Sequence, residues 1–120
     1  AREISLDFEM IQQVIMNLVL NSIESITGPG GRIIIKSYYA NNLYIIEISD
    51  NGSGIRESHL NMIFEPFFST KNNGTGLGLA ISKKIINLHN GSIRVESANR
   101  SGTMFIISLP TDLPDITKTT

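Results

Sequence analysis

Two stretches of helical periodicity, each followed by two runs of strand length, constrain the fold of this chain more than any other feature. Apolar residues recur at three- and four-residue steps from Phe8 to Ile26 and again from Leu77 to His89. Four runs have the length and the Ile, Val or Tyr content of strands: residues 32–40, 43–50, 93–97 and 103–109. This order predicts an α+β domain, a sheet of mainly antiparallel strands covered on one face by helices.

Short polar or glycine-rich segments mark the ends of these elements. Asp7 is placed to cap the first helix, and Gly28-Pro29-Gly30-Gly31 follows it as a stop. Asn41-Asn42 tolerates positive φ, so the first two strands are expected to form a hairpin. Asn90-Gly91 ends the second helix. Between the hairpin and that helix, residues 51–76 form a long glycine-rich loop, a length that is usually functional or disordered.

The composition fits one domain with one core. The 120 residues include ten Lys plus Arg and eleven Asp plus Glu, and 41% are hydrophobic. Because no Lys/Arg cluster is present, this balance argues against a surface for nucleic acid or anionic membrane. The absence of Cys excludes disulfides and a Cys nucleophile. We expect a domain over residues 1–110, truncated at its N-terminal edge, and a flexible tail over residues 111–120.

Asn17 and Asn21 lie one helical turn apart in an otherwise apolar stretch. Their side chains therefore point the same way, and at least one of them should be largely buried. Burying an amide without a hydrogen-bond partner costs a few kcal/mol of stability. Either the two amides cap backbone groups in the core, or an amide oxygen is a hard ligand suited to Mg²⁺.

Residues 50–54, Asp-Asn-Gly-Ser-Gly, follow directly on a predicted strand. They place a carboxylate at a strand end where two glycines let a ligand approach the backbone. A calcium loop does not fit, because Gly52 and Gly54 stand where Asp or Asn is required. A plain turn is the alternative to a binding site.

Residues 74–79, Gly-Thr-Gly-Leu-Gly-Leu, run into the second helix. Their glycines would expose free N–H groups and the positive end of the helix dipole to an anion such as phosphate. Neither a dinucleotide-binding nor a phosphate-loop spacing fits, and a flexible hinge is the alternative. Lys71 precedes this cluster, either as a solvated loop charge or as a cation that closes over a phosphate.

Three aromatic residues lie in residues 64–68, Phe-Glu-Pro-Phe-Phe, where an ordinary loop would be polar. They either anchor the loop on the core or grip a partner.

Together these segments resemble, in order and spacing, the catalytic and ATP-binding domain of bacterial sensor histidine kinases, within the superfamily that includes gyrase, heat-shock protein 90 and mismatch-repair ATPases. The resemblance covers about residues 5–110. The matching motifs are residues 17–21 (the N box), 50–55 (the first Gly box), 64–68 (the F box) and 74–79 (the second Gly box). This resemblance implies a two-layer α/β sandwich, the Bergerat ATP-binding fold, with ATP and Mg²⁺ as cofactors.

Carried over residue by residue, the resemblance implies that Asn21 binds Mg²⁺, with Asn17 supporting it in catalysis. Asp50 would accept the adenine amino proton, helped by a water shared with Thr103, and Lys71 would contact the γ-phosphate. The remaining nucleotide contacts would come from Gly52, Gly54 and Ile55 at the base, and from Thr75, Gly76, Leu77, Gly78 and Leu79 at the phosphates.

The lid and the end of the first helix look most similar to the nitrogen-regulatory and sporulation kinases. Glu24 and Ser25 depart from the basic and aromatic residues that many members carry there. Phosphate charge compensation and adenine stacking are therefore expected from elsewhere.

A hydrolytic ATPase or an anti-sigma-type serine kinase is the runner-up, and a degenerate binding module is a third hypothesis. The catalytic relatives place a Glu one turn before the metal Asn as general base, whereas this chain has Asn17. Neither His59 nor His89 has the acidic neighbour of the family's phosphoacceptor. The implied partners are the dimerisation and phosphoacceptor helical hairpin of a parent kinase and a response regulator. We expect a monomeric, cytoplasmic domain that does not itself insert into a membrane.

Overall fold

The computed structural model describes residues 7–68, 77–97 and 102–111 of the chain. Its helices and strands follow one another in the predicted order. They are α1 (Phe8–Ser25), β1 (Ile33–Ala40), β2 (Leu43–Asp50), α2 (Glu57–Leu60), α3 (Gly78–Leu88), β3 (Ser92–Ser97) and β4 (Thr103–Pro110). Of the expected tail, residues 112–120 lie outside the described residues. Thr111 donates its backbone N–H to the carbonyl oxygen of Asn42 at 3.1 Å.

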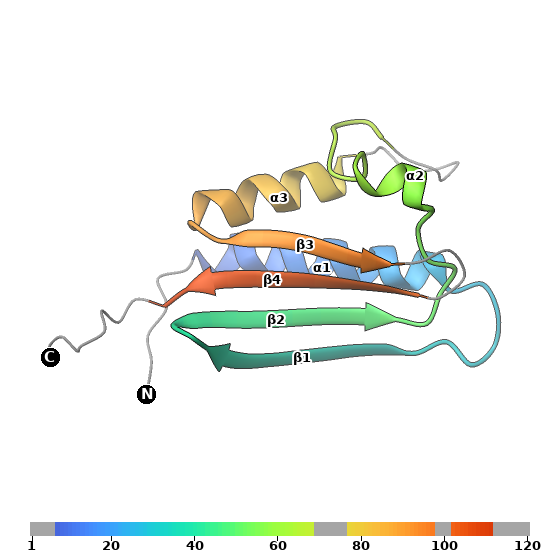
Figure 1. Ribbon diagram of the computed structural model, residues 1–120, viewed down its shortest axis with the longest axis horizontal. Coiled ribbons are helices and arrows are strands. Elements are labelled where there is room, and N and C mark those ends of the chain that lie inside the picture. Colours follow the sequence, from blue (N-terminus) through green and yellow to red (C-terminus); the bar gives the residue numbers. More distant parts are fainter. Residues whose placement is uncertain (1–6, 69–76, 98–101, 112–120) are drawn as a thin grey trace, which may run out of the picture.

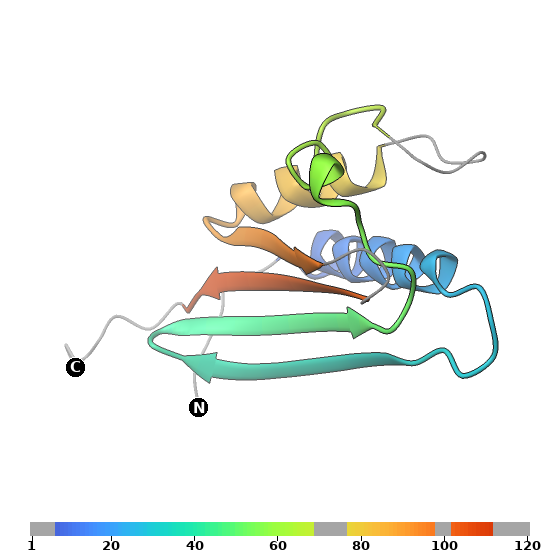
Figure 2. The same cartoon turned by 45° about the vertical axis from the view of Figure 1, so that its right-hand side comes forward.

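The strands of the described residues form one antiparallel sheet in the order β1-β2-β4-β3. Both long helices, α1 and α3, lie on the same face of this sheet (Figure 1, Figure 2). This two-layer arrangement confirms the predicted fold class. The core between the layers is made of buried aliphatic side chains and one phenylalanine: Ile11, Val14, Leu18, Ile46, Ile48, Ile63, Ile85, Ile86, Ile93, Phe105, Ile107 and Leu109. Each such side chain contributes roughly 1.5–3 kcal/mol when it is fully buried.

The first helix begins as the sequence predicts. Asp7 is its N-cap, and Asp7 Oδ1 accepts a hydrogen bond from the backbone N–H of Met10 at 3.2 Å. This bond satisfies one of the N–H groups that a helix start leaves without an intrahelical partner. The helix ends at Ser25 because Ile26 is extended, with φ −93° and ψ 119°. One stripe of α1 is buried against the sheet: Ile11, Val14, Leu18 and Ser22.

The β1–β2 hairpin turns at Asn41-Asn42, as predicted. Both residues have positive φ, 53° and 67°, and Ala40 pairs with Leu43 across the turn. Two-residue turns with positive φ at both positions match the twist of the strands that they join. Because a slip of one residue would move Ile46 and Ile48 from the core face to the open face, this turn decides which side chains reach the core.

His89 ties the start of α1 to the end of α3. Its Nδ1 lies 2.8 Å from the carbonyl oxygen of Ile85, and its Nε2 accepts the backbone N–H of Asp7 at 2.9 Å. These partners assign the proton to Nδ1, which donates to Ile85. His89 thereby joins two segments 82 residues apart in sequence.

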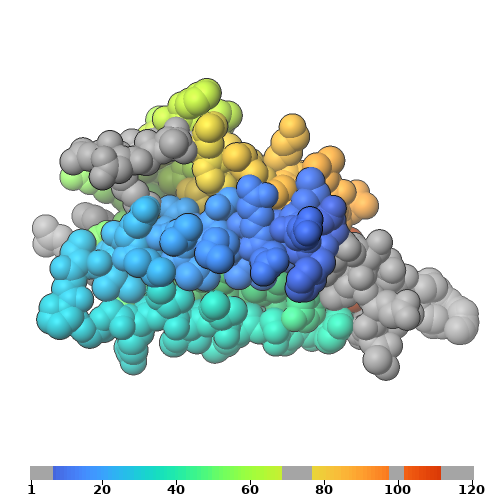
Figure 3. Space-filling model, turned by 180° about the vertical axis from the view of Figure 1, so that it is seen from behind, coloured from blue at the N-terminus to red at the C-terminus, as the bar shows by residue number. Residues whose placement is uncertain are grey.

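Several of the predicted motif segments lie at the same end of the sheet. The ends of β2, β3 and α1 lie there, together with the starts of β4 and α3, while the β1–β2 turn lies at the opposite end (Figure 1). Seen from the helix side, α1 runs along the length of the sheet (Figure 3).

Within residues 7–68, 77–97 and 102–111, no helix is both long and apolar enough to cross a bilayer.

Candidate functional site

Asp50 lies at the end of β2, with its carboxylate turned toward the end of α1. Its Oδ1 accepts the backbone N–H of Gly52 at 2.8 Å and lies 3.2 Å from Ser25 Oγ. In the described part of the chain, no donor reaches the second carboxylate oxygen, Oδ2. One oxygen therefore holds the carboxylate in place, and the other is available to accept a hydrogen bond from a ligand.

The glycine-rich turn after Asp50 packs directly on the end of α1. The backbone N–H of Ser53 donates to the carbonyl oxygen of Ser25 at 3.0 Å. A Cβ added to Gly52 would overlap Ser25 Oγ and would lie 2.6 Å from that carbonyl oxygen. Gly54 has φ +77°, which side chains rarely adopt. Both glycines are thus required by close approach and backbone shape.

Asn17 joins α1 to the first turn of α3. Its Nδ2 donates to the carbonyl oxygen of Gly78 and to Ser82 Oγ, each at 3.3 Å. The amide nitrogen of Asn21 donates to the carbonyl oxygen of Asn17 at 3.0 Å. Because the nitrogen of Asn21 is committed to its own helix, its oxygen is the atom with the chemistry to take a cation. The two amide nitrogens therefore cap backbone carbonyls, as the first interpretation expects, and the ligand interpretation stays a prediction.

The start of α3 presents helix N–H groups beside Asn17. Leu77 is the N-cap, without a side-chain cap, and the helix proper begins at Gly78, followed by Leu79. The first N–H groups of a helix have no intrahelical partner and favour an anion. Four residues of the sequence prediction, Lys71, Gly74, Thr75 and Gly76, lie outside the described residues.

Thr103 faces the same end of the sheet, paired in register with Asp50 on one side and with Ser97 on the other. Ser97 Oγ accepts the backbone N–H of Ile55 at 2.8 Å and lies 3.0 Å from Thr103 Oγ1. It also lies 2.7 Å from the carbonyl oxygen of Gly102, to which it donates. Ser97 thereby ties the glycine-rich loop to the β3–β4 pair.

The aromatic residues of the loop differ in how far they are buried. Phe64 packs edge-on against Phe105 of β4 with ring centres 6.4 Å apart, so it anchors the loop on the core. Phe68 is half-buried and contacts the ring of His59 at 5.4 Å. Phe67 is 76% exposed and has φ +68°. Of the three, Phe67 presents the most surface to a partner.

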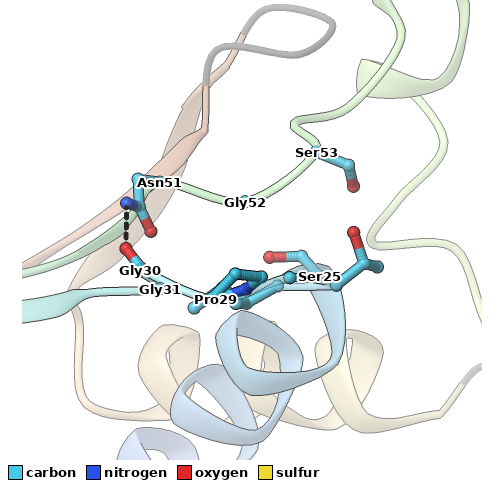
Figure 4. A pocket seen from close by; sticks show the side chains of 10 residues that line it. Ser25, Pro29, Gly30, Gly31, Asn51, Gly52 and Ser53 are labelled. Atoms are coloured by element: carbon cyan, nitrogen blue, oxygen red, sulfur yellow. Dashed lines mark hydrogen bonds between the residues drawn. The ribbon is translucent and has the colours of Figure 1, made fainter.

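A cavity of about 240 Å³ adjoins this site. It lies between the loop after α1 and the glycine-rich turn, with Pro29 on one side and Ser53 on the other (Figure 4). Asn51 holds the loop closed, since its Nδ2 donates to the carbonyl oxygen of Gly30 at 3.0 Å and its Oδ1 accepts the N–H of Arg32 at 2.7 Å. Asp50, Asn21 and Thr103 do not line this cavity.

Sequence reasoning missed the serines of the site. Ser25 was noted only as a departure from an aromatic residue, and Ser82 and Ser97 were not singled out. Their partners belong to other elements, so no local pattern identifies them. Across the described residues, no three His, Cys, Asp or Glu side chains gather as a metal-binding group.

Comparison with known proteins decides the family. Residues 6–113 match the family model described as histidine kinase-, DNA gyrase B- and HSP90-like ATPase. The chain belongs to this family. Its relatives include the signal transduction histidine-protein kinase AtoS of Escherichia coli, 44% identical over 89% of this chain and 18% of AtoS. Sporulation kinase B of Bacillus subtilis is 39% identical over 90% of this chain and 25% of that kinase.

Solved histidine kinase domains share the fold of this family member. The nucleotide-free catalytic domain of histidine kinase ThkA superposes with a TM-score of 0.78 at 41% identity, covering 89% of this chain and 70% of that one. The mycobacterial sensor histidine kinase MprB gives a TM-score of 0.81 at 30% identity, covering 90% and 76%. The chain is therefore a catalytic domain of the sensor histidine kinase type. It spans about a fifth to a quarter of the curated relatives described above.

Proposed function

We propose that this domain binds ATP with Mg²⁺ and transfers the γ-phosphate to a histidine on the separate dimerisation and phosphoacceptor hairpin of its parent kinase. A response regulator aspartate would then receive the phosphate. The observation that carries this proposal is the set of hydrogen bonds from α1 to the two other segments: Ser25 bonds Asp50 at the end of β2, and Asn17, which bonds Asn21, bonds Gly78 at the start of α3. These segments supply an acceptor for a base, an amide oxygen for a cation and helix N–H groups for phosphates.

The base is recognised by Asp50. With Oδ1 held by Gly52 and Ser25, Oδ2 accepts the adenine amino proton. Thr103, which is 7% exposed, shares a water with the base through Oγ1, whose orientation is set by Ser97. The backbone of Gly52, Gly54 and Ile55 forms the wall of the base site. Guanine has a carbonyl in place of the amino group, so its oxygen would face the carboxylate of Asp50 with no proton between them.

The phosphates lie at the start of α3. Gly78 and Leu79 donate backbone N–H groups, and further phosphate contacts are assigned to Leu77, Thr75 and Gly76 on the family resemblance alone. Asn21 is the residue that fits Mg²⁺, since its amide nitrogen is used within α1 and its oxygen is a hard donor. When bound, the ion would neutralise part of the phosphate charge. Lys71 adds a cation at the γ-phosphate, so Lys71→Ala should slow transfer more than it weakens adenine binding.

The transfer forms an N–P bond to the acceptor imidazole while the bond from the γ-phosphorus to the bridging oxygen breaks, and ADP leaves. The imidazole nitrogen attacks through its own lone pair and needs no strong base. Asn17 suits this reaction, because its amide cannot accept a proton and its nitrogen is engaged with Gly78 and Ser82. The absence of a carboxylate at this position disfavours the ATPase and serine kinase alternatives.

Calorimetric titration tests the nucleotide site. We expect micromolar affinity for ATP and ADP, about −6 to −8 kcal/mol, that depends on Mg²⁺ and on Asp50. Equal affinity of wild type and Asp50→Asn, or indifference to Mg²⁺, contradicts the assignment. ATP hydrolysis by the chain alone should be very slow, and a turnover near the ~10 s⁻¹ median of enzymes would favour the ATPase alternative.

Labelled ATP tests the transfer. Incubation with Mg²⁺ and the parent hairpin should place acid-labile phosphate on the hairpin alone. Label on the 120-residue chain itself refutes the proposed division of roles. His59 and His89 are poor acceptors, since the first packs on Phe68 and the second is bonded at both ring nitrogens. We further propose that the domain is monomeric and cytoplasmic and docks on the hairpin partly through Phe67 and Phe68.

A further inference from the structure

Lys83 places its ammonium group over the ring of Phe64. The residue lies in the second turn of α3, and its Nζ is 5.4 Å from the centre of that ring. Lys83 is exposed, and no described carboxylate lies within ion-pair distance of it. A cation over the face of an aromatic ring within about 6 Å is attracted by the ring. At an exposed site this attraction is worth a factor of about two to five in an equilibrium constant.

The core fixes the ring that Lys83 contacts. Phe64 packs edge-on against Phe105 of β4, with ring centres 6.4 Å apart and ring planes at 75°. The residue before it, Ile63, is 6% exposed and belongs to the hydrophobic core. The ammonium of Lys83 therefore meets a ring whose position is already set, so the contact ties α3 to the loop that carries Phe64.

The loop residues after Phe64 form a compact turn through their own backbone. The N–H of Glu65 donates to the carbonyl oxygen of Met62 at 2.9 Å, and the N–H of Phe68 donates to that of Glu65 at 3.2 Å. These bonds hold the turn together but do not attach it to α3. The contact between Lys83 and Phe64 does attach it.

The same turn of α3 is bonded to α1. Ser82 is the neighbour of Lys83, and its Oγ accepts a hydrogen bond from Asn17 Nδ2 at 3.3 Å. The helix whose first N–H groups are proposed to bind the phosphates is thus attached to α1 through Ser82 and to the loop through Lys83.

We propose that Lys83 is a positioning residue for phosphate transfer. Through the ring of Phe64, it holds the two phenylalanines proposed for docking, Phe67 and Phe68, in place relative to the helix that binds the phosphates. This inference rests on the proposed function, in which the acceptor histidine must line up with the γ-phosphate while the hairpin lies against these phenylalanines. Because Lys83 acts through the loop, its loss should slow transfer and leave nucleotide affinity unchanged.

Lys83→Met tests the proposal, because it keeps the length of the side chain and removes the charge. We expect the kcat of transfer to the parent hairpin to fall about two- to fivefold, while the KM for ATP and the calorimetric affinities for ATP and ADP stay unchanged. Hydrogen exchange of the Phe68 N–H, followed by NMR, should accelerate by a similar factor. Lys83→Arg should keep the wild-type values, since a guanidinium also stacks on aromatic rings.

Lys84→Met is the matched control. It removes the same charge from the next residue of α3, an exposed lysine without a ring contact in the described part of the chain. Transfer and exchange should stay at wild-type values. An equal loss in Lys84→Met overturns the proposal, because the effect would then be one of net charge.

Phe64→Leu completes a double-mutant cycle, since it keeps an apolar side chain against the core and removes the ring. Adding Lys83→Met to Phe64→Leu should have no further effect. An undiminished effect in that background overturns the proposal, as does a loss of nucleotide affinity in Lys83→Met, which would make the lysine a nucleotide ligand. Wild-type kcat and exchange in Lys83→Met overturn this inference alone. A wild-type chain that binds ATP but transfers nothing to the hairpin overturns the proposed function, and this inference with it.

Discussion

Replacing Asn17 by Asp exchanges one amide nitrogen for an oxygen at the joint between α1 and α3. In the native chain that nitrogen donates to the carbonyl oxygen of Gly78 and to Ser82 Oγ, each at 3.3 Å. In Asn17→Asp, an oxygen faces the carbonyl oxygen of Gly78 with no proton between them. Ser82 can rotate its hydroxyl to donate to the carboxylate. The carbonyl of Gly78 carries no proton and cannot become a donor.

The expected loss of stability follows from these contacts. A net hydrogen bond contributes about 1 kcal/mol, and an ionised group left against an acceptor in a half-buried site costs about 1–3 kcal/mol more. We therefore expect the free energy of unfolding to fall by about 2–4 kcal/mol at neutral pH. The carbonyl of Gly78 and the partial burial raise the pKa of the introduced carboxyl, and the protonated form can donate again. The loss should shrink as pH falls through that raised pKa toward the unfolded value of about 4.

Urea unfolding followed by circular dichroism, relative to wild type at each pH, measures this effect. With a slope of about 2 kcal/mol/M, the midpoint should shift by roughly 1–2 M at neutral pH. Asn17→Ala is the control, because it removes the donor without adding charge and should give a smaller, pH-independent loss. Wild-type stability in Asn17→Asp, or a loss that equals that of Asn17→Ala at every pH, would refute the reasoning.

Three further substitutions test other parts of the structure. Gly52→Ala should weaken ATP binding at least tenfold, because the added methyl overlaps the end of α1, whereas Gly28→Ala, with open space around it, should not change titration curves. His89→Ala should lower the free energy of unfolding by about 1–2 kcal/mol in urea while nucleotide affinity stays unchanged, since it removes two bonds far from the site. The hydrogen bond from Tyr38 to Glu47 raises the pKa of the phenol above 10.0, so Glu47→Gln should lower the pKa of Tyr38 in an ultraviolet titration; an unmoved pKa contradicts the assigned cause.

The fold was predictable because its determinants are local. The repeat of Ile11, Val14 and Leu18 on α1 fixes a buried stripe, and a cap at Asp7 fixes where the helix begins. Asn41-Asn42 sets the hairpin and, through it, the face to which each β2 side chain points. Each of these signals can be recognised in a short segment of sequence, without knowledge of the rest of the fold.

The site was only partly predictable. The positions of Asp50 and Asn21 followed from their motifs, but the hydroxyls that orient Asp50 and the glycine-rich loop did not. Ser25 and Ser97 have no distinctive local pattern, because each acquires its role from segments 25 to 42 residues away. Likewise, nothing in residues 64–68 distinguishes the anchoring Phe64 from the exposed Phe67, since burial depends on where β4 passes.

The bonds of His89 fasten the start of α1 to the end of α3. The helices run antiparallel, and the tie between Asp7 and His89 lies at the end remote from the site, at 2.9 Å. At the site itself, the bonds from Asn17 to the first turn of α3 are longer, at 3.3 Å. The two long helices are thus fastened to one another at two points, by His89 at the end remote from Asp50 and by Asn17 at the first turn of α3, so a substitution at either point loosens one end of the pair alone.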